Sequence, residues 1–222
     1  MTPGRARLVL TAAAMLVGTP LLGACSPADP GSPEIRARAA AAGTAADRML
    51  EQLSDGDPLA AAFRDGCRRG QHNWKVKDDF DWDCGFHRYQ AVEANGTLRE
   101  VIEAQHQRLL AAGCQPDQTD NEQRRGLPVM LDHYEKYASS PHKLPSVRYL
   151  CAHQVAVGVK ISDPSDPSLS TGPVLDAWSQ GALARDRVLS EKVPDEATRA
   201  RLTGSKAKVL VLKTASVKYY RA

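Results

Sequence analysis

Four cysteines in the body of the chain constrain its fold more strongly than any other feature. They stand at Cys67, Cys84, Cys114 and Cys151. The chain opens with a short basic stretch and an apolar run from Leu8 to Leu22, the pattern of a secretory signal sequence. In an exported protein an even number of cysteines predicts a disulfide framework. We expect Cys67–Cys84 and Cys114–Cys151, because each bridge closes one local unit, and the lack of any C-x-x-C pair disfavours structural zinc.

A further cysteine ends the apolar run, in the sequence Leu22-Gly23-Ala24-Cys25. This ending resembles the lipobox of bacterial lipoproteins. The resemblance implies cleavage before Cys25, a diacylglyceryl group on its thiol, palmitate modification, and retention at the extracytoplasmic face of the cell membrane. The apolar run is shorter than the roughly 20 residues of a spanning helix. A plain signal peptide, which would leave Cys25 as a spare thiol, is the alternative.

Three segments follow from this interpretation. Residues 1–24 are a cleaved lipoprotein signal peptide, residues 25–32 a flexible tether, and residues 33–222 a single domain. Residues 1–24 hold two arginines and no acid, so their removal lowers the formal net charge from +3 to +1. A near-neutral exported body lacks the clustered basic face typical of nucleic-acid binding. The expected partners are the membrane, through the lipid on Cys25, and an envelope protein or glycan.

Local signals predict several helices. Ser32 is an N-cap before Pro33, and the apolar period continues to Leu53. Thr97 and Glu100 form a capping box that begins a second helix. Further helical segments are expected over residues 59–64, 127–137, 174–191 and 195–202.

Strand patterns dominate the rest of the chain. Apolar and charged residues alternate from Trp74 to Phe86, which predicts a strand pair reversing at Asp78-Asp79. The apolar residues from 147 to 161 share one parity, interrupted at His153, which predicts a strand. Residues 163–173 are expected to form a polar loop. The apolar run within residues 206–220 predicts an interior strand of the sheet. The chain therefore predicts an α+β fold: a mostly antiparallel sheet with helices packed on one side and two disulfides.

The alternating block also holds the candidate ligand site. It contains five of the chain's twelve aromatic residues: Trp74, Phe80, Trp82, Phe86 and Tyr89. Such a cluster can stack on a sugar or peptide, with Asp81, Asp83 and His87 as polar partners. Only Tyr89 shares their outer parity, and the even parity of the other aromatics favours a place in the core of the sheet.

The aspartates of this block raise the question of calcium. Asp79, Asp81 and Asp83 match the first three ligand positions of an EF-hand loop. The match fails at Cys84, where the turn needs glycine, and at Gln90, where the closing Glu is required. Strand alternation already accounts for the carboxylates, so we expect no metal site.

The sequence carries no signature of catalysis. The six histidines form no H-x-x-x-H pair, and no G-x-S-x-G elbow is present. We expect no cofactor and favour a non-enzymatic domain that binds a cell-envelope ligand or partner. The alternatives are a structural subunit of an envelope complex and an envelope hydrolase with a non-contiguous site. The hydrolase requires a cleft where a histidine, a carboxylate and a hydroxyl come within hydrogen-bond reach.

Overall fold

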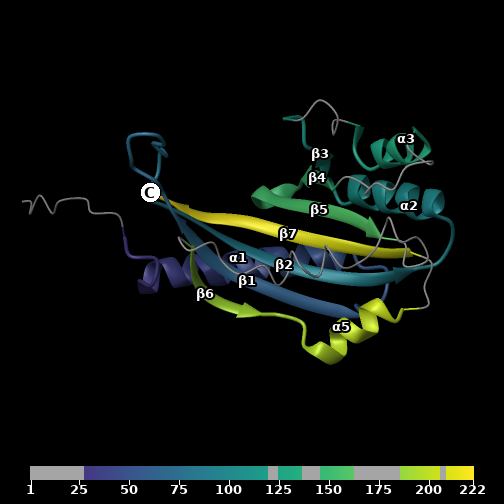
Figure 1. Cartoon of the computed structure of the whole chain (residues 1–222), viewed down its shortest axis with the longest axis horizontal. Helices are drawn as coiled ribbons and strands as arrows, with labels where there is room; N and C mark the ends of the chain where they lie inside the picture. Colours follow the sequence, from purple (N-terminus) through teal and green to yellow (C-terminus); the bar gives the residue numbers. More distant parts are fainter. Residues whose placement is uncertain (1–27, 120–124, 137–145, 163–185, 206–208) are drawn as a thin grey trace, which may run out of the picture.

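Seven strands of one antiparallel sheet form the frame of the molecule in the computed structural model (Figure 1). The structure describes residues 28–119, 125–136, 146–162, 186–205 and 209–222. The strands are β1 (Ala60–Arg69), β2 (Trp82–Ala94), β3 (Gln115–Pro116), β4 (Val147–Leu150), β5 (Val155–Ser162), β6 (Asp186–Lys192) and β7 (Val209–Arg221). Their order across the sheet is β3-β4-β5-β7-β2-β1-β6. β7 is thus an interior strand, as its continuous apolar run predicts.

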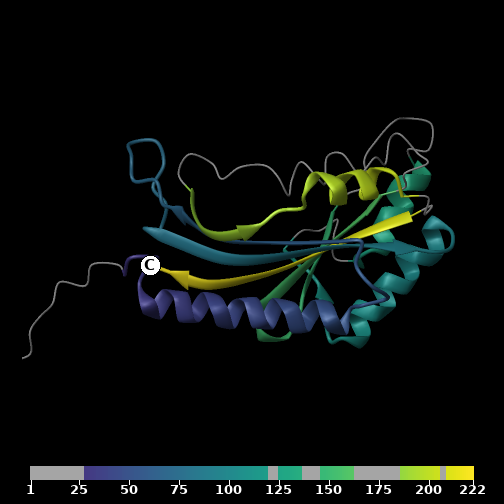
Figure 2. The ribbon, with the colours of Figure 1, turned by 90° about the horizontal axis from the view of Figure 1, so that it is seen from below.

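The main helices pack on one face of this sheet. The described α-helices are α1 (Pro33–Gln52), α2 (Leu98–Ala111), α3 (Pro128–Lys136) and α5 (Glu196–Thr203). Figure 2 shows α1 lying along one face and the short helix α5 on the other. Leu202 of α5 joins a small apolar cluster with Ala62 and Leu212. The α+β class, the antiparallel sheet and the two disulfides are confirmed, and α5 adds a minor patch on the second face.

Small residues let α1 approach the sheet closely. Ser32 caps the helix, since its Oγ accepts a hydrogen bond from the Ile35 N–H at 3.4 Å. A Cβ added to Gly43 would lie 3.2 Å from the ring of Phe86 on β2, so even alanine would be tight there. Phe86 in turn stacks on Phe63 of β1, with 5.7 Å between ring centroids. The helix and the sheet therefore share a closely packed core.

A buried lysine joins the end of α1 to the sheet and to α2. Lys213 of β7 is only 1% exposed, and its Nζ donates to the Leu53 carbonyl at 2.5 Å and to Asp55 Oδ1 at 3.0 Å. Asp55 also accepts hydrogen bonds from Gln105 at 2.5 Å and Arg108 at 2.8 Å, both on α2. Burial lowers the pKa of Lys213, and the Asp55 carboxylate opposes that shift.

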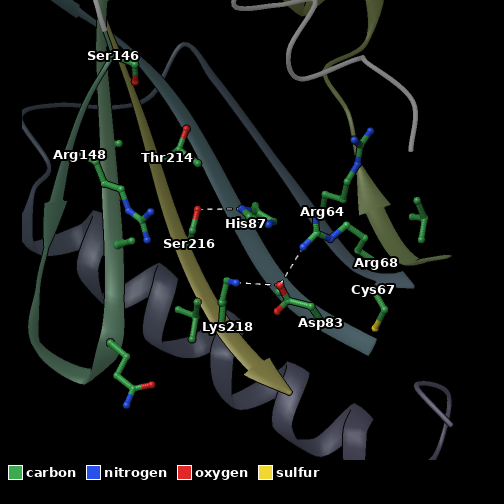
Figure 3. Close-up of a pocket in the computed structure, with 17 residues that line it drawn as sticks. Arg64, Cys67, Arg68, Asp83, His87, Ser146, Arg148, Thr214, Ser216 and Lys218 are labelled. Carbon is green, nitrogen blue, oxygen red and sulfur yellow. Dashed lines mark hydrogen bonds and ion pairs between the residues drawn. The ribbon is translucent and has the colours of Figure 1, made fainter. Parts of the chain in front are cut away.

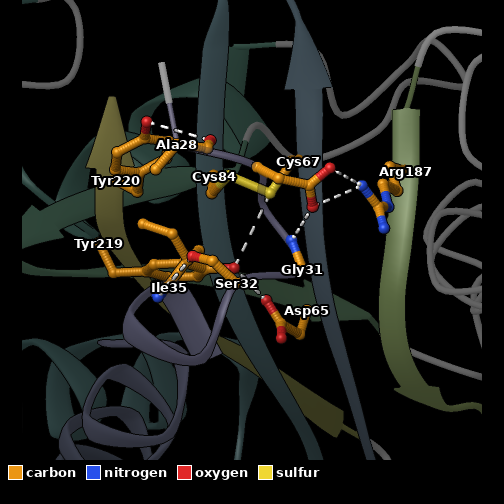
Figure 4. Close-up of a disulfide and its surroundings, with 11 residues drawn as sticks. Ala28, Gly31, Ser32, Ile35, Asp65, Cys67, Cys84, Arg187, Tyr219 and Tyr220 are labelled. Atoms are coloured by element: carbon orange, nitrogen blue, oxygen red, sulfur yellow. Dashed lines mark hydrogen bonds and ion pairs between the residues drawn. A yellow bond between two sulfur atoms is a disulfide. The ribbon is translucent and has the colours of Figure 1, made fainter. Parts of the chain in front are cut away.

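Both predicted disulfide pairings are confirmed. Cys67 and Cys84 stand directly opposite each other on β1 and β2, with an S–S distance of 2.06 Å (Figure 4). Cys114 follows α2 and bonds Cys151 after β4, with an S–S distance of 2.00 Å. Gly113, at φ +76°, follows α2 and turns the chain toward Cys114.

The alternating block folds as part of a longer hairpin than its sequence predicts. β1 occupies residues 60–69, so the helical piece predicted over 59–64 is wrong. β1 pairs with β2 from Ala60↔Ala91 to Arg69↔Trp82. The reversal therefore spans residues 70–81 and is not centred on Asp78-Asp79. Pairing with β2 and β6 decides the structure of β1, because an alanine-rich stretch has little strand preference of its own.

Two further expectations need correction. Residues 147–161 form two strands, because the chain reverses through the 3-10 turn η2 (Ala152–Gln154) with His153 and Gln154 at positive φ. The helix predicted over 174–191 is wrong where it can be compared, since residues 186–192 form β6. Residues 163–185, and residues 1–27 with Cys25, lie outside the described residues. The helices predicted over 127–137 and 195–202 correspond to α3 and α5.

Candidate functional site

A groove of about 670 Å³ lies on the sheet face opposite α1 (Figure 3). Its lining residues come from five neighbouring strands and from β6 at the edge. A groove of this volume falls in the range of small-molecule sites, roughly 300–1,000 Å³. It is the candidate site of this protein.

Glycines form the floor of the groove. Gly66 of β1 and Gly85 of β2 are direct partners in the sheet, and Gly158 of β5 pairs with Thr214 of β7. Side chains alternate between the two faces of a strand, so a larger residue at any of these positions would project into the groove. The missing side chains therefore create the depression.

Basic side chains stand around this floor. Arg64, Arg68, Arg148 and Lys218 line the groove together with one acid, Asp83. Lys218 Nζ lies 2.9 Å from Asp83 Oδ2, and Arg68 lies 3.8 Å from the same oxygen. The Asp83 side chain is only 11% exposed, and its Oδ1 has no hydrogen-bond partner among the described residues. Asp83 thus fixes two cations at one end of the groove while the groove keeps an excess of positive charge.

The other two arginines are held from outside the groove. Arg64 Nε lies 3.0 Å from Glu191 Oε2 of β6, and Arg148 Nε lies 3.6 Å from Asp117 Oδ2. The Arg148 side chain is 55% exposed and lines the groove, so its guanidinium is accessible to solvent there. These pairs orient the cations toward the open side of the sheet.

A histidine and a serine meet in the middle of the groove. His87 Nδ1 lies 2.8 Å from Ser216 Oγ (Figure 3). Burial lowers the pKa of His87, and the charges of Arg64 and Lys218 lower it further, so the ring is neutral at pH 7. Tyr89 follows on the same face of β2, and its ring stacks beside His87 at a centroid distance of 6.4 Å.

The four candidate ligand residues do not form one site. Asp83 and His87 line the groove, and Tyr89 lies beside them against the cluster around Leu202. Asp81 lies outside the groove lining, where its Oδ1 is 2.9 Å from His72 Nε2. The outer face of β2 is therefore predicted correctly from residue 83 onward.

Sequence reasoning missed the basic residues from the neighbouring strands. Thr214, Ser216 and Lys218 alternate with buried residues on β7, a polar outer parity that could have indicated them. Arg64 falls in the segment wrongly predicted as helical, residues 59–64, and Arg68 lies outside every strand predicted from the sequence. Bringing them together needs the strand order, which the sequence pattern does not specify.

The aromatic residues divide between core and surface. Phe80 and Phe86 are buried, as the core interpretation predicts. Trp74 is 88% exposed, so that interpretation is wrong for this residue. Trp82 is half-buried at the start of β2.

The aspartates of the possible calcium loop point to three different side chains. Asp79 pairs with Arg221, Asp81 with His72, and Asp83 with Lys218. Within the described ranges, no group of three or more His, Cys, Asp or Glu residues converges in a way that could hold a metal ion.

Comparisons with known proteins supply no relative for this fold and groove. No protein family matches the chain, and neither the curated proteins nor the solved structures contain a significant match. None of the helices in the described part of the chain has the length and apolar character needed to cross a membrane.

Proposed function

We propose that this chain is a lipid-anchored extracytoplasmic protein that binds an anionic cell-envelope ligand in the groove. The lipobox-like ending at Cys25 supports the anchor and the compartment, and the two disulfides are consistent with an oxidising location. The single observation that carries the binding function is the glycine-floored groove with its excess of basic side chains.

The groove chemistry suits a sugar acid or a sugar phosphate. Arginine and lysine form charge-assisted hydrogen bonds with carboxylate and phosphate oxygens. The hydroxyls of Ser146, Thr214 and Ser216 and the amide of Gln154 also line the groove. These groups both donate and accept hydrogen bonds, as recognition of sugar hydroxyls requires. A glycan component of the envelope combines these two chemistries.

The anchor is tested by replacing Cys25 with serine in the producing cell. The wild-type chain should fractionate with the membrane and incorporate labelled palmitate. The Cys25→Ser chain should lose the label and be released as a folded, disulfide-bonded domain. Retention of this variant in the membrane through another segment would contradict the anchor.

The ligand class is tested by calorimetric titration of the purified protein with glucuronic acid, glucose 6-phosphate and glucose. The two anionic probes should bind about tenfold tighter than glucose, the contribution of roughly one charge-assisted hydrogen bond. Arg148→Gln and Lys218→Gln should each remove most of this preference.

Arg99→Gln on α2 is the matched control, because Arg99 is exposed and does not line the groove. It should leave all three affinities unchanged. Equal affinity for glucose and the anions, no binding at millimolar concentration, or an equal loss in the control would each contradict the proposal.

The contact between His87 and Ser216 favours a second candidate, an envelope hydrolase. A neutral histidine within 2.8 Å of a serine hydroxyl satisfies two of the three requirements for such a site. The nearby carboxylate of Asp83 pairs with Lys218 instead of orienting His87. A fluorophosphonate probe separates the candidates: labelling that Ser216→Ala abolishes would support the hydrolase, whereas a binding protein should remain unlabelled.

A further inference from the structure

The reversal between β1 and β2 carries an exposed apolar and basic tip, defined as residues 73–77. Trp74 is 88% exposed, the largest value among the exposed large hydrophobic residues of the described chain, and Val76 is 42% exposed. Lys75 Nζ lies 4.7 Å from the centroid of the Trp74 ring. Lys77 follows directly, and its backbone forms a bridge with His72. The tip therefore presents an indole and two ammonium groups to solvent.

The backbone of the tip is tightly turned. Asn73 Oδ1 accepts hydrogen bonds from the N–H groups of Lys75 and Val76, each at 2.9 Å. The Asn73 N–H donates to the Val76 carbonyl, also at 2.9 Å. The exposed Trp74 thus lies in a closed turn of four residues, 73–76.

The base of the reversal is packed and fixed. Phe80 is buried, and the guanidinium groups of Arg68 and Arg221 lie 4.8 and 5.1 Å from its ring centroid. A Cβ added to Gly70 would lie 1.8 Å from the Phe80 carbonyl oxygen, so only glycine fits there. The tip is therefore a projection on a rigid support.

Charges are segregated along this projection. Asp78, Asp79 and Asp81 all lie at the base, where Asp78 accepts from the Gln71 N–H, Asp79 pairs with Arg221, and Asp81 pairs with His72. The tip itself carries two lysines and no acid. An anionic surface that approached the tip would meet positive charge first.

The projection lies at the end of the molecule where the described chain begins. Tyr220 Oη donates to the Ala28 carbonyl at 3.3 Å, and the neighbouring Ala222 exchanges backbone hydrogen bonds with Trp82 at 3.0 and 3.1 Å. Figure 1 shows the C-terminus, the start of α1 and the reversal together at this end. Cys25 precedes Ala28 by three residues, a chain length of at most about 11 Å.

We infer that the tip of residues 73–77 is a second membrane contact, which inserts Trp74 into the interface of an anionic bilayer. Tryptophan prefers the membrane–water interface, and lysines beside it are attracted by anionic headgroups. The inference rests on the proposed lipid at Cys25, which would bring this end of the molecule to the bilayer.

The test uses the full chain reconstituted into vesicles of phosphatidylcholine and phosphatidylglycerol with brominated acyl chains. Flotation with the vesicles that Cys25→Ser abolishes reports the lipid anchor. The fluorescence difference between the wild type and Trp74→Phe isolates the Trp74 emission. This emission should shift to the blue and be quenched by the brominated lipid. If the chain floats but Trp74 is quenched only by aqueous iodide, the tip inference is wrong while the anchor stands.

A chain that does not float refutes the anchor, and its tip is then tested by titration with preformed vesicles. Binding to phosphatidylglycerol vesicles should be lost in Trp74→Ala. It should fall about fivefold for each of Lys75→Gln and Lys77→Gln, the effect of about 1 kcal/mol per lysine near an anionic surface. It should also weaken in high salt.

Lys192→Gln and Val193→Ala are the matched controls, since both residues are exposed and stand before α5, away from the projection (Figure 1). They should leave Trp74 quenching and vesicle affinity unchanged. Binding that is unaffected by the tip variants, or equally reduced by these controls, would overturn the inference.

Discussion

At the scale of single residues, Asp65 is a buried carboxyl whose ionisation opposes folding. It is 6% exposed on β1 and accepts a hydrogen bond from Tyr219 Oη at 2.6 Å (Figure 4). Burial raises the pKa of Asp65, and the Tyr219 hydroxyl only partly offsets that shift. The same burial and the nearby carboxylate raise the pKa of Tyr219. The folded state therefore favours the protonated form of Asp65 more than the unfolded chain does.

The raised pKa of Asp65 determines the direction in which the free energy of unfolding changes with pH. For a raised pKa, the stabilising contribution is full below the unfolded pKa of about 3.9 and is lost as the pH rises through the folded pKa. Asp65→Asn cannot ionise and should keep its stability as the pH rises. In urea unfolding from pH 3.5 to 7.5, the free energy of unfolding of the variant should increase relative to that of the wild type as the pH rises, until Asp65 of the wild type is ionised in the folded state.

Asp79→Asn is the control of opposite sign. The hydrogen bond from Arg221 lowers the pKa of Asp79, whose contribution is therefore present above about pH 3.9 and lost below it. This exposed residue should show a small effect in the reverse direction. A parallel pH profile for Asp65→Asn and the wild type would show that the carboxyl is not destabilised by burial.

At the scale of elements, the sequence predicts those whose determinants are local. The N-cap Ser32 and the capping box of Thr97 and Glu100 each mark a helix that the structure contains. Each cap bonds a backbone N–H within three or four residues, so the neighbouring sequence suffices to specify it. The same holds for β7, whose apolar run is long enough to indicate an interior strand.

Elements that depend on distant partners are predicted poorly. β1 has an alanine-rich start and becomes a strand through pairing with β2 and β6. The segment around His153 looks like one strand because its parity continues through the reversal. The basic side of the groove is not predicted for the same reason. Arg64 and Arg68 come close to Lys218 only through the strand order β7-β2-β1.

The junction of α1, α2 and β7 gives the prediction at this scale. Lys213→Met should destabilise the fold by about 1–3 kcal/mol, because the Leu53 carbonyl loses its buried donor and Asp55 loses one of its two cations. Although burial favours neutral Asp55, the charge and hydrogen bond of Lys213, with Gln105 and Arg108, hold its pKa below the ordinary value. Urea unfolding of the purified variant measures the loss.

The double variant Lys213→Met/Asp55→Asn distinguishes the ion pair from packing. If the loss comes from a buried carboxylate that keeps only Arg108 as a cation, removing its charge should restore part of the stability. Strictly additive losses in the two single variants would instead assign the effect to the lysine's hydrogen bond with Leu53 and its packed stem.

At the scale of the whole molecule, the two disulfides restrict different lengths of chain. Cys67–Cys84 spans 17 residues between strands that already pair, whereas Cys114–Cys151 spans 37 and ties the end of α2 to the edge strands. Loop-closure entropy assigns them about 3 and about 4 kcal/mol respectively. Cys114→Ser/Cys151→Ser should therefore lower the free energy of unfolding by about 0.7 kcal/mol more than Cys67→Ser/Cys84→Ser.

The Cys67–Cys84 bridge contributes less to stability, but it should contribute more to ligand binding in the groove. Cys67 precedes Arg68 and Cys84 follows Asp83, so this bridge fixes the strand positions that carry a cation and its acid. Cys67→Ser/Cys84→Ser should weaken binding of glucose 6-phosphate at a temperature where the domain stays folded, and Cys114→Ser/Cys151→Ser should leave that affinity unchanged. Calorimetric titration of both variants, with circular dichroism to verify folding, measures the difference. Equal losses of affinity in the two variants would mean that the bridges act on the groove only through global stability.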